Sequence, residues 1–167
     1  ENYFLITALF FILSMNFANA VNHEKFKAKL LGAGGENHGL VELLSTPNGV
    51  LLDAKLKGIS EGSHGFHIHS VGKCEPPFKT AGGHFNPTNA AHGIPVSGGH
   101  AGDMPNIHVP SSGKLRVEIL NTKVSLKKGT ANDISGLSII IHAKDDDYQS
   151  QPSGAAGSRI ACGVITQ

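Results

Sequence analysis

The stretch Gly65-Phe66-His67-Ile68-His69-Ser70 places two histidines two residues apart in a run that is otherwise typical of a β-strand. Alternate side chains of a pleated strand lie on one face, so His67 and His69 point together while Phe66 and Ile68 point the other way. Two imidazoles on one rigid face are half of a metal site. The alternative is a pair of solvent-facing histidines on a half-buried strand.

The composition favours a small β-protein that binds metal. The chain has 167 residues with 40% hydrophobic content, which suits one core. Ten histidines, two cysteines, no tryptophan and 21 glycines indicate a turn-rich β-fold with metal ligands. The formal net charge is +1, so nothing suggests a polyanionic partner, and no basic or amphipathic patch indicates nucleic acid or a membrane surface.

The first twenty residues are expected to lie outside the fold. The chain is almost wholly apolar from Phe4 to Phe17 and then reads Ala18-Asn19-Ala20, a small-x-small cleavage pattern. We therefore expect a signal peptide at 1–20, truncated at its start because it lacks Met and a basic n-region, and a mature domain at 21–167. An uncleaved N-terminal anchor is the alternative. Export would place the domain where a disulfide persists.

Short alternating runs at roughly regular spacing predict an antiparallel sandwich or barrel. The residues of 45–48, Ser-Thr-Pro-Asn, are typical of the turn of a hairpin. No window sustains a helical stripe. The expected strands are 25–30, 39–44, 49–56, 66–70, 115–120, 138–142 and 160–165.

Two long connections interrupt that spacing, and the first carries potential metal ligands. Between Ser70 and about Ile107 no strand pattern occurs, and a loop of this length is usually functional. It contains His84, His92, His100 and Asp103, three imidazoles and one carboxylate of the kind that suits structural zinc. The second long connection is 143–158.

A second set of nitrogen ligands comes from the strands. His142, at the end of the isoleucine run, joins His67 and His69. Nitrogen-only ligation with an open position favours copper over calcium or magnesium. The other histidines (His23, His38, His64 and His108) fit neither set and are interpreted as surface or hydrogen-bonded residues.

These motifs resemble the copper,zinc superoxide dismutase family, in particular its exported bacterial, periplasmic branch. The resemblance covers essentially all of the mature chain, in the family's order. The segments that carry it are Gly65-Phe66-His67-Ile68-His69, Gly83-His84-Phe85-Asn86-Pro87, His92-Gly93, His100-Ala101-Gly102-Asp103 and Gly157-Ser158-Arg159-Ile160-Ala161-Cys162-Gly163-Val164-Ile165.

The resemblance implies a fold, an activity and a set of residue roles. The fold would be an eight-stranded antiparallel Greek-key β-barrel, an immunoglobulin-like sandwich with two long functional loops. The activity would convert two superoxide radicals and two protons to dioxygen and hydrogen peroxide by copper redox cycling. His84 would bridge the metals and relay a proton. Copper would be held by His67, His69, His84 and His142, and zinc by His84, His92, His100 and Asp103.

Three further roles are expected outside the ligands. The resemblance implies that Asp146 hydrogen-bonds one histidine of each site, although the acidic run 145–147 could instead be solvated. It also implies that Arg159 guides and docks superoxide. Cys74 and Cys162 are the only cysteines and should pair in an exported chain, while two free buried thiols would suit a reducing compartment.

Two other function classes are alternatives to the enzyme. An exported copper or zinc buffer needs neither Arg159 nor a bridging His84. A zinc hydrolase needs an open zinc position and a nearby general base, which the closed ligand set lacks. Superoxide is the expected substrate, with no nucleic acid, no membrane contact after leader cleavage, and monomer and homodimer both open. The expected location is the periplasm, or otherwise the extracellular space.

Overall fold

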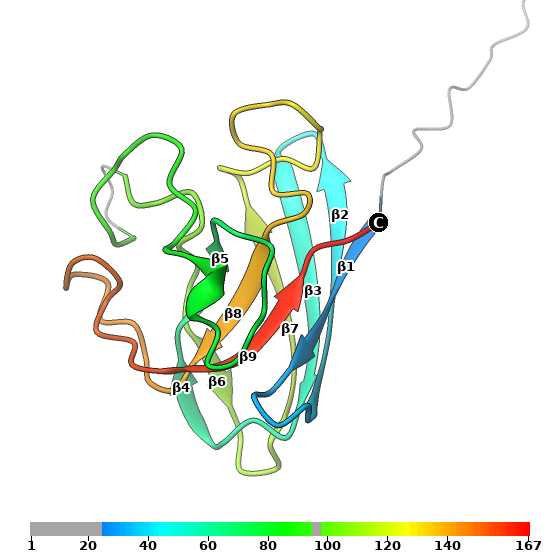
Figure 1. The fold of residues 1–167 in the computed structure, drawn as a ribbon, viewed down its shortest axis with the longest axis vertical. Helices are drawn as coiled ribbons and strands as arrows, with labels where there is room; N and C mark the ends of the chain where they lie inside the picture. Colours follow the sequence, from blue (N-terminus) through cyan, green and yellow to red (C-terminus); the bar gives the residue numbers. More distant parts are fainter. Residues whose placement is uncertain (1–24, 95–97) are drawn as a thin grey trace, which may run out of the picture.

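The computed structural model describes residues 25–94 and 98–167, and the expected leader at 1–20 lies outside them. Nine strands and one 3-10 turn make up the regular structure of the described residues (Figure 1). They are β1 Lys25–Leu31, β2 Asn37–Thr46, β3 Gly49–Lys57, β4 Gly62–His64, β5 Phe66–His69, η1 Lys79–Ala81, β6 Ile107–Val109, β7 Lys114–Asn121, β8 Ser138–His142 and β9 Arg159–Val164.

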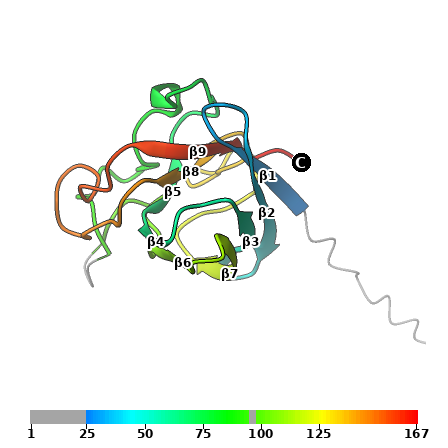
Figure 2. The same ribbon diagram turned by 90° about the horizontal axis from the view of Figure 1, so that it is seen from below.

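The strands form an antiparallel barrel. Seven of them pair in the order β5-β8-β9-β1-β2-β3-β7, and β4 pairs with β6. Figure 2 looks along the barrel and shows the β4–β6 pair between β5 and β7, so that the strands form a ring. Only Gly65 separates β4 from β5, and counting these two as one interrupted strand gives the expected eight. The predicted all-β Greek-key fold is confirmed.

The meander β1-β2-β3 forms because its residues alternate between core and solvent. Strand β1 is exposed and buried in strict alternation, with Phe26, Ala28 and Leu30 in the core. The hairpin β2–β3 alternates in the same way, since the buried residues Val41 and Leu43 pair with the buried residues Ala54 and Leu52. One face of these strands therefore closes the core and the other faces solvent.

Strands β5 and β8 are buried on both faces. Every residue of Phe66–His69 and of Ser138–His142 is buried, and Phe66 pairs with Ile141 while Ile68 pairs with Ile139. These four apolar residues face the core, whereas Ile140 packs against the first long loop. The alternative of solvent-facing histidines is wrong, because the long loops cover the other face of these strands.

The two long loops lie on the same side of the barrel, beside β5 and β8 (Figure 1). Within the described part of loop 70–106 the turn η1 is the one regular element, and loop 143–158 has no strand or helix. Among the described residues, no helix has the length and apolar character needed to cross a membrane.

Candidate metal centre

Four histidines meet where β5 and β8 face the first long loop. They are His67 and His69 from β5, His142 from the end of β8 and His84 from the loop. All four are buried, and one ring nitrogen of each lies within 4.8 Å of the corresponding atoms of the others. We call this set the four-histidine group.

A second group lies beside the first. His84, His92, His100 and Asp103 are all buried, and their ligand atoms also lie within 4.8 Å of one another. The carboxylate of Asp103 is central, because it lies 2.7 Å from Nδ1 of His84 and 3.1 Å from Nδ1 of both His92 and His100. We call this set the His-Asp group.

The backbone of β5 holds the loop in place. The N–H of Ile68 donates to the carbonyl of Gly102 at 3.0 Å, and the N–H of Phe85 donates to the carbonyl of Ile68 at 2.8 Å. A Cβ on Gly102 would lie 2.2 Å from the Ile68 carbonyl oxygen, so only glycine permits this approach. These bonds bring His84 and Asp103, neighbours of Phe85 and Gly102, next to β5.

In the four-histidine group, the outward nitrogen of each strand histidine faces an acceptor. His67 Nε2 lies 2.8 Å from Asp146, His69 Nδ1 lies 3.0 Å from the Gly82 carbonyl, and His142 Nδ1 lies 3.4 Å from the Gly157 carbonyl. A neutral imidazole that donates from one nitrogen keeps a lone pair on the other. The three lone pairs therefore point inward, and the Nε2 atoms of His69 and His142 face each other at 3.3 Å.

Three buried ring nitrogens of the described residues lack a hydrogen-bond partner: His67 Nδ1, His84 Nε2 and His92 Nδ1. His92 Nδ1 is within ion-pair distance of Asp103, but its direction is unsuited to a hydrogen bond. Buried polar atoms without partners are costly, and lone pairs that converge repel each other. Metal ions in the two groups would satisfy all three atoms, so these residues fit a pair of bound metals.

His84 is the residue that the groups share. Its Nδ1 faces Asp103, and its Nε2 is unpaired and belongs on the side of the four-histidine group. The His84 ring centroid lies 4.1 Å from that of His67 and 5.3 Å from that of His92, between the two groups.

Asp146 connects the two groups through a hydrogen bond with one histidine of each. Its side chain is fully buried, with Oδ2 2.8 Å from His67 Nε2 and Oδ1 2.9 Å from His92 Nε2. Burial alone would raise the pKa of Asp146, but the hydrogen bonds from the two histidines hold it below its ordinary value. The acidic run 145–147 is therefore not uniformly solvated, since only Asp146 of the three is buried.

Burial keeps the strand histidines neutral. Desolvation lowers the pKa of His69 to about 2 and that of His142 to about 3, and it also lowers the pKa of His67. Burial would raise the pKa of Asp103, yet hydrogen bonds from His84 and from the N–H of Gly93 lower it to about 2. Neutral imidazoles and an ionised carboxylate are the forms that bind metal ions.

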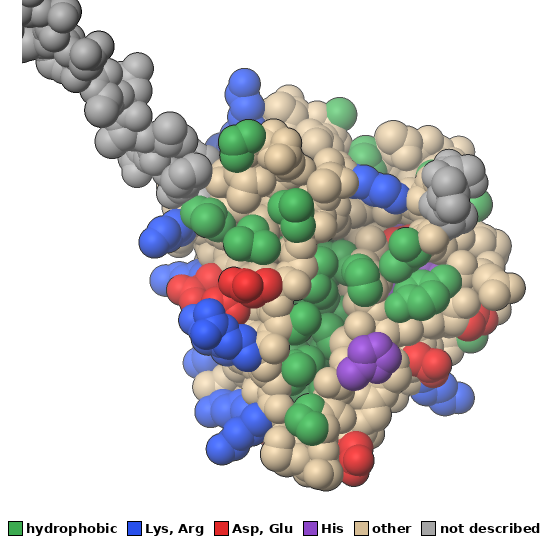
Figure 3. All heavy atoms as spheres, turned by 180° about the vertical axis from the view of Figure 1, so that it is seen from behind, with side chains coloured by type: hydrophobic (Ala, Val, Ile, Leu, Met, Phe, Trp, Pro, Cys, Tyr) green, Lys and Arg blue, Asp and Glu red, His purple; other side chains and the backbone are tan. Residues whose placement is uncertain are grey.

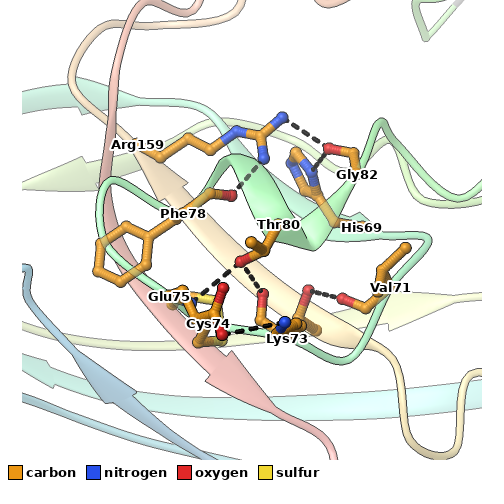
Figure 4. The surroundings of a disulfide bond; sticks show 11 residues. His69, Val71, Lys73, Cys74, Glu75, Phe78, Thr80, Gly82 and Arg159 are labelled. Carbon is orange, nitrogen blue, oxygen red and sulfur yellow. Dashed lines mark hydrogen bonds and ion pairs between the residues drawn. A yellow bond between two sulfur atoms is a disulfide. The ribbon is translucent and has the colours of Figure 1, made fainter.

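Arg159 lies at the start of β9, where it pairs with His142 of β8. Its guanidinium donates to the carbonyls of Phe78 and Gly82, and Gly82 also accepts from His69 (Figure 4). Desolvation lowers the pKa of Arg159, and the side chain remains a cation at neutral pH because arginine does not deprotonate in proteins. A fixed positive charge therefore adjoins the four-histidine group.

The predicted disulfide forms between Cys74 in the first long loop and Cys162 in β9, with a Cα–Cα distance of 5.6 Å (Figure 4). It fastens the segment whose carbonyls hold Arg159 to the strand that carries Arg159. A loop of 88 residues is closed by this bond.

Two residues that support the groups were not predicted from the sequence. Gln151 accepts from the backbone N–H of His92 at 2.8 Å and donates to its carbonyl at 3.0 Å. Asn106 makes the same reciprocal pair with the backbone of Asp146, at 2.8 Å in both directions. No sequence pattern distinguishes a supporting amide side chain from any other in a polar loop, so neither residue could be predicted.

The structure brings together every residue predicted for the two metal sites. The remaining histidines behave as expected where they are described: His38 is half-buried, His108 is exposed, and His64 is buried with its ring nitrogens at the carbonyls of His142 and Ser60. His23 lies outside the described residues.

Comparisons with known proteins agree with this geometry. The family model described as Copper/zinc superoxide dismutase (SODC) matches residues 37–165. "Superoxide dismutase [Cu-Zn] 1" of Aquifex aeolicus is 46% identical over 84% of this chain and 87% of its own length. "Superoxide dismutase [Cu-Zn]" of Caulobacter vibrioides is 41% identical over 78% and 79%.

Solved structures show the same fold. A SOD-like protein from Bacillus subtilis superposes with a TM-score of 0.78 at 38% identity and covers 83% of this chain and 96% of its own. Cu/Zn superoxide dismutase from Brucella abortus gives a TM-score of 0.71 at 29% identity over 85% and 99%. The four-histidine group fits a copper site and the His-Asp group fits a zinc site. The chain therefore belongs to the copper/zinc superoxide dismutase family, a family of oxidoreductases.

Proposed function

We propose that this chain converts two superoxide radicals and two protons to dioxygen and hydrogen peroxide at the centre built around His84. The observation that carries the proposal is the pair of buried ligand groups that share this one imidazole, with Nε2 unpaired and Nδ1 against Asp103. Membership of the family supports the reaction, and the contacts of individual residues support their roles.

The ligand assignment follows from the donor atoms. The four-histidine group would hold copper, because it offers only imidazole nitrogens, and the His-Asp group would hold zinc, because three imidazoles and a carboxylate close a four-coordinate set. One ion of each per chain is expected. Copper held in the four-histidine group would supply one-electron redox chemistry, by which one superoxide is oxidised to dioxygen and a second is reduced to peroxide.

His84 is proposed to supply a proton at Nε2. Asp103 holds its Nδ1 at 2.7 Å, so the ring cannot turn away when the proton arrives or leaves. Nε2 faces the four-histidine group and has no other partner, so a proton there can pass to the reduced substrate. Peroxide dianion formation in a buried site would be costly, and protonation removes that cost.

Arg159 is proposed to dock superoxide. Its two donors to Phe78 and Gly82 fix the guanidinium beside His69 and His142, which prevents it from swinging into solvent. A planar cation with several N–H donors is suited to a small anion. Positive potential near the four-histidine group also raises the rate at which superoxide reaches it, and this increase becomes smaller as the salt concentration rises.

Export is proposed from three observations. The leader-like sequence at 1–20 precedes the domain at 21–167, the cysteines form a disulfide, and such bonds persist in oxidising compartments. A relative from Caenorhabditis elegans, 37% identical over 84% of this chain, is named an extracellular superoxide dismutase. We propose the periplasm, or otherwise the extracellular space.

A metal buffer built on the same barrel is the second candidate function. One relative, 40% identical over 82% of this chain, is named a superoxide dismutase-like protein. The fixed Arg159 and the shared His84 favour the enzyme, since a buffer requires neither.

The test is superoxide consumption by the purified protein, measured with its metal content. Activity should disappear with a chelator and return with copper but not with zinc alone. Both metals bound without any consumption of superoxide would overturn the enzyme and support the buffer.

A further inference from the structure

The outer face of strands β1, β2, β3 and β7 carries a concentration of positive charge that the net charge conceals. It presents seven of the 14 Lys and Arg residues of the chain and only three of its 13 acidic residues. Figure 3 shows Lys and Arg side chains gathered along one edge of the molecule, with a few acidic side chains among them. The cations are Lys25, Lys27, Lys29, Lys55, Lys57, Lys114 and Arg116.

A hollow lies at one end of this face, with a volume of about 670 Å³. Five of the cations line it, no carboxylate does, and Leu40, Leu56 and Leu115 contribute apolar surface. The lining cations are Lys29, Lys55, Lys57, Lys114 and Arg116.

The strand register places like charges opposite each other in the hollow. Lys55 pairs with Arg116, and Lys57 pairs with Lys114 in the next row along the same two strands. Like charges directly opposite on one face of a sheet are destabilising. The described ion pairs relieve the first row only, since Lys55 contacts Glu42 and Asp53 while Arg116 contacts Asp53. The second row has no acidic partner among them, and neither has Lys29.

We propose that this hollow binds a linear polyanion with closely spaced phosphate groups. A phosphate seated between Lys57 and Lys114 would relieve the uncompensated repulsion, and the next phosphate along the chain would meet Lys29 or the Lys55–Arg116 row. The lining contains no aromatic side chain on which a base could stack, so a phosphate polymer without bases is favoured over single-stranded nucleic acid.

The site is separate from the metal centre. The hollow is lined by residues of β1, β2, β3 and β7, whereas the metal ligands come from β5, β8 and the first long loop. Figure 2 shows β5 and β8 on a different side of the barrel from β2, β3 and β7. The polymer would therefore retain the protein on an anionic matrix and leave the metal centre open. Sequence composition predicted no polyanionic partner, because the +1 net charge averages this face with a rest of the chain in which acids outnumber cations.

The test compares two double variants that remove the same charge. The test variant, Lys57→Gln with Lys114→Gln, removes both charges of the row that has no acidic partner among the described ion pairs. The control variant, Lys127→Gln with Lys128→Gln, removes two exposed lysines that do not line the hollow. Binding of the metal-loaded protein to labelled inorganic polyphosphate is measured by anisotropy over a range of salt concentrations. Metal content is measured afterwards, since polyphosphate also binds cations.

We expect the parent to bind with a strong inverse salt dependence. The Lys57/Lys114 variant should bind about tenfold or more weakly, with the slope of log K against log salt reduced by about 2. The Lys127/Lys128 variant should bind almost as the parent does. Removing a like-charge pair should not lower the melting temperature, so loss of binding cannot be attributed to unfolding.

Three results would overturn the proposal. They are no binding of the parent to polyphosphate at low salt, equal weakening by the two double variants, or binding to anionic phospholipid vesicles or single-stranded DNA without binding to polyphosphate. The last result would assign the face to a lipid surface or a nucleic acid instead.

Discussion

Replacing Asp146 by asparagine removes one buried carboxylate that supports both metal groups. The carboxylate accepts from His67 Nε2 at 2.8 Å and from His92 Nε2 at 2.9 Å, and its side chain is fully buried. An asparagine amide has only one acceptor oxygen. Its NH2 group would face one of the two histidines and require that ring to carry its proton on Nδ1, which is the atom needed as a lone pair toward the metal.

The magnitude follows from the two bonds at stake. A hydrogen bond to a charged group contributes about 1.5–3 kcal/mol, and loss of such support around a metal ligand typically costs 10- to 100-fold in affinity. We therefore expect Asp146→Asn to weaken zinc through His92 and copper through His67, each by 10- to 100-fold. One substitution should affect two metals.

The assay is competition of each metal-loaded protein with a chelator of known affinity. Asp145→Asn is the matched control, because it removes the same charge from the neighbouring position, which is exposed. Unchanged affinities in Asp146→Asn would refute the reasoning. Equal losses in both variants would also refute it, since they would reflect loop charge and not support of the imidazoles.

Four other perturbations have defined outcomes. His84→Ala should lose zinc affinity and the spectrum of the bridged pair, while His108→Ala, at an exposed histidine outside both groups, should keep them as measured by metal titration. Arg159→Ala should retain both metals but lose about tenfold in kcat/KM at low salt, and a variant as fast as the parent would exclude its docking role. Replacing Cys74 and Cys162 by serine should lower the free energy of unfolding by about 4–5 kcal/mol in urea titrations, because a loop of 88 residues is no longer closed. In the metal-free protein, the pKa values of His67, His69 and His142 are lowered by folding, so below pH 6.5 the unfolded chain binds up to three more protons than the folded chain. The free energy of unfolding should therefore fall with decreasing pH by up to about 4 kcal/mol per pH unit. A free energy of unfolding that stays constant from pH 7 to 5 in urea titrations would contradict this.

Much of the barrel could be predicted because its strands alternate. All seven predicted strands occur, and each of their ends lies within two residues of the one expected. Strands β4 and β6 were not predicted, because a strand of three residues is too short to display the two-residue alternation of a β-strand. They comprise Gly62–His64 and Ile107–Val109. Their pairing depends on the closure of the ring, which is a tertiary property.

The spacing of His67 and His69 predicted one pair of metal ligands, and the other ligands were predicted from residue type and family resemblance. Long irregular gaps separate His84, His92 and His100. The loop folds back onto β5 through backbone hydrogen bonds such as those of Phe85 and Gly102 to Ile68, which no spacing predicts. The support from Gln151 and Asn106, and the carbonyls that hold Arg159, could not be predicted, because they depend on backbone positions within irregular loops.

The basic hollow on the outer face could not be predicted, although the strands that form it were. The alternation over 25–30 correctly predicts a strand with one solvent-exposed face, but the register that places Lys57 opposite Lys114 is set by pairing between β3 and β7. Lys57 and Lys114 are 114 − 57 = 57 positions apart in the sequence, so no local pattern links them. The net charge of the chain therefore cannot predict a basic hollow that is assembled from four strands.

The sharing of His84 is tested most directly by a crystal structure of the metal-loaded protein, with anomalous data collected at the copper and zinc absorption edges. We predict copper in the four-histidine group and zinc in the His-Asp group, with the two nitrogens of His84 each about 2.0–2.1 Å from a different ion. A His84 ring that contacts one ion only, or zinc and copper found in the same group with the other group empty, would contradict a shared imidazole.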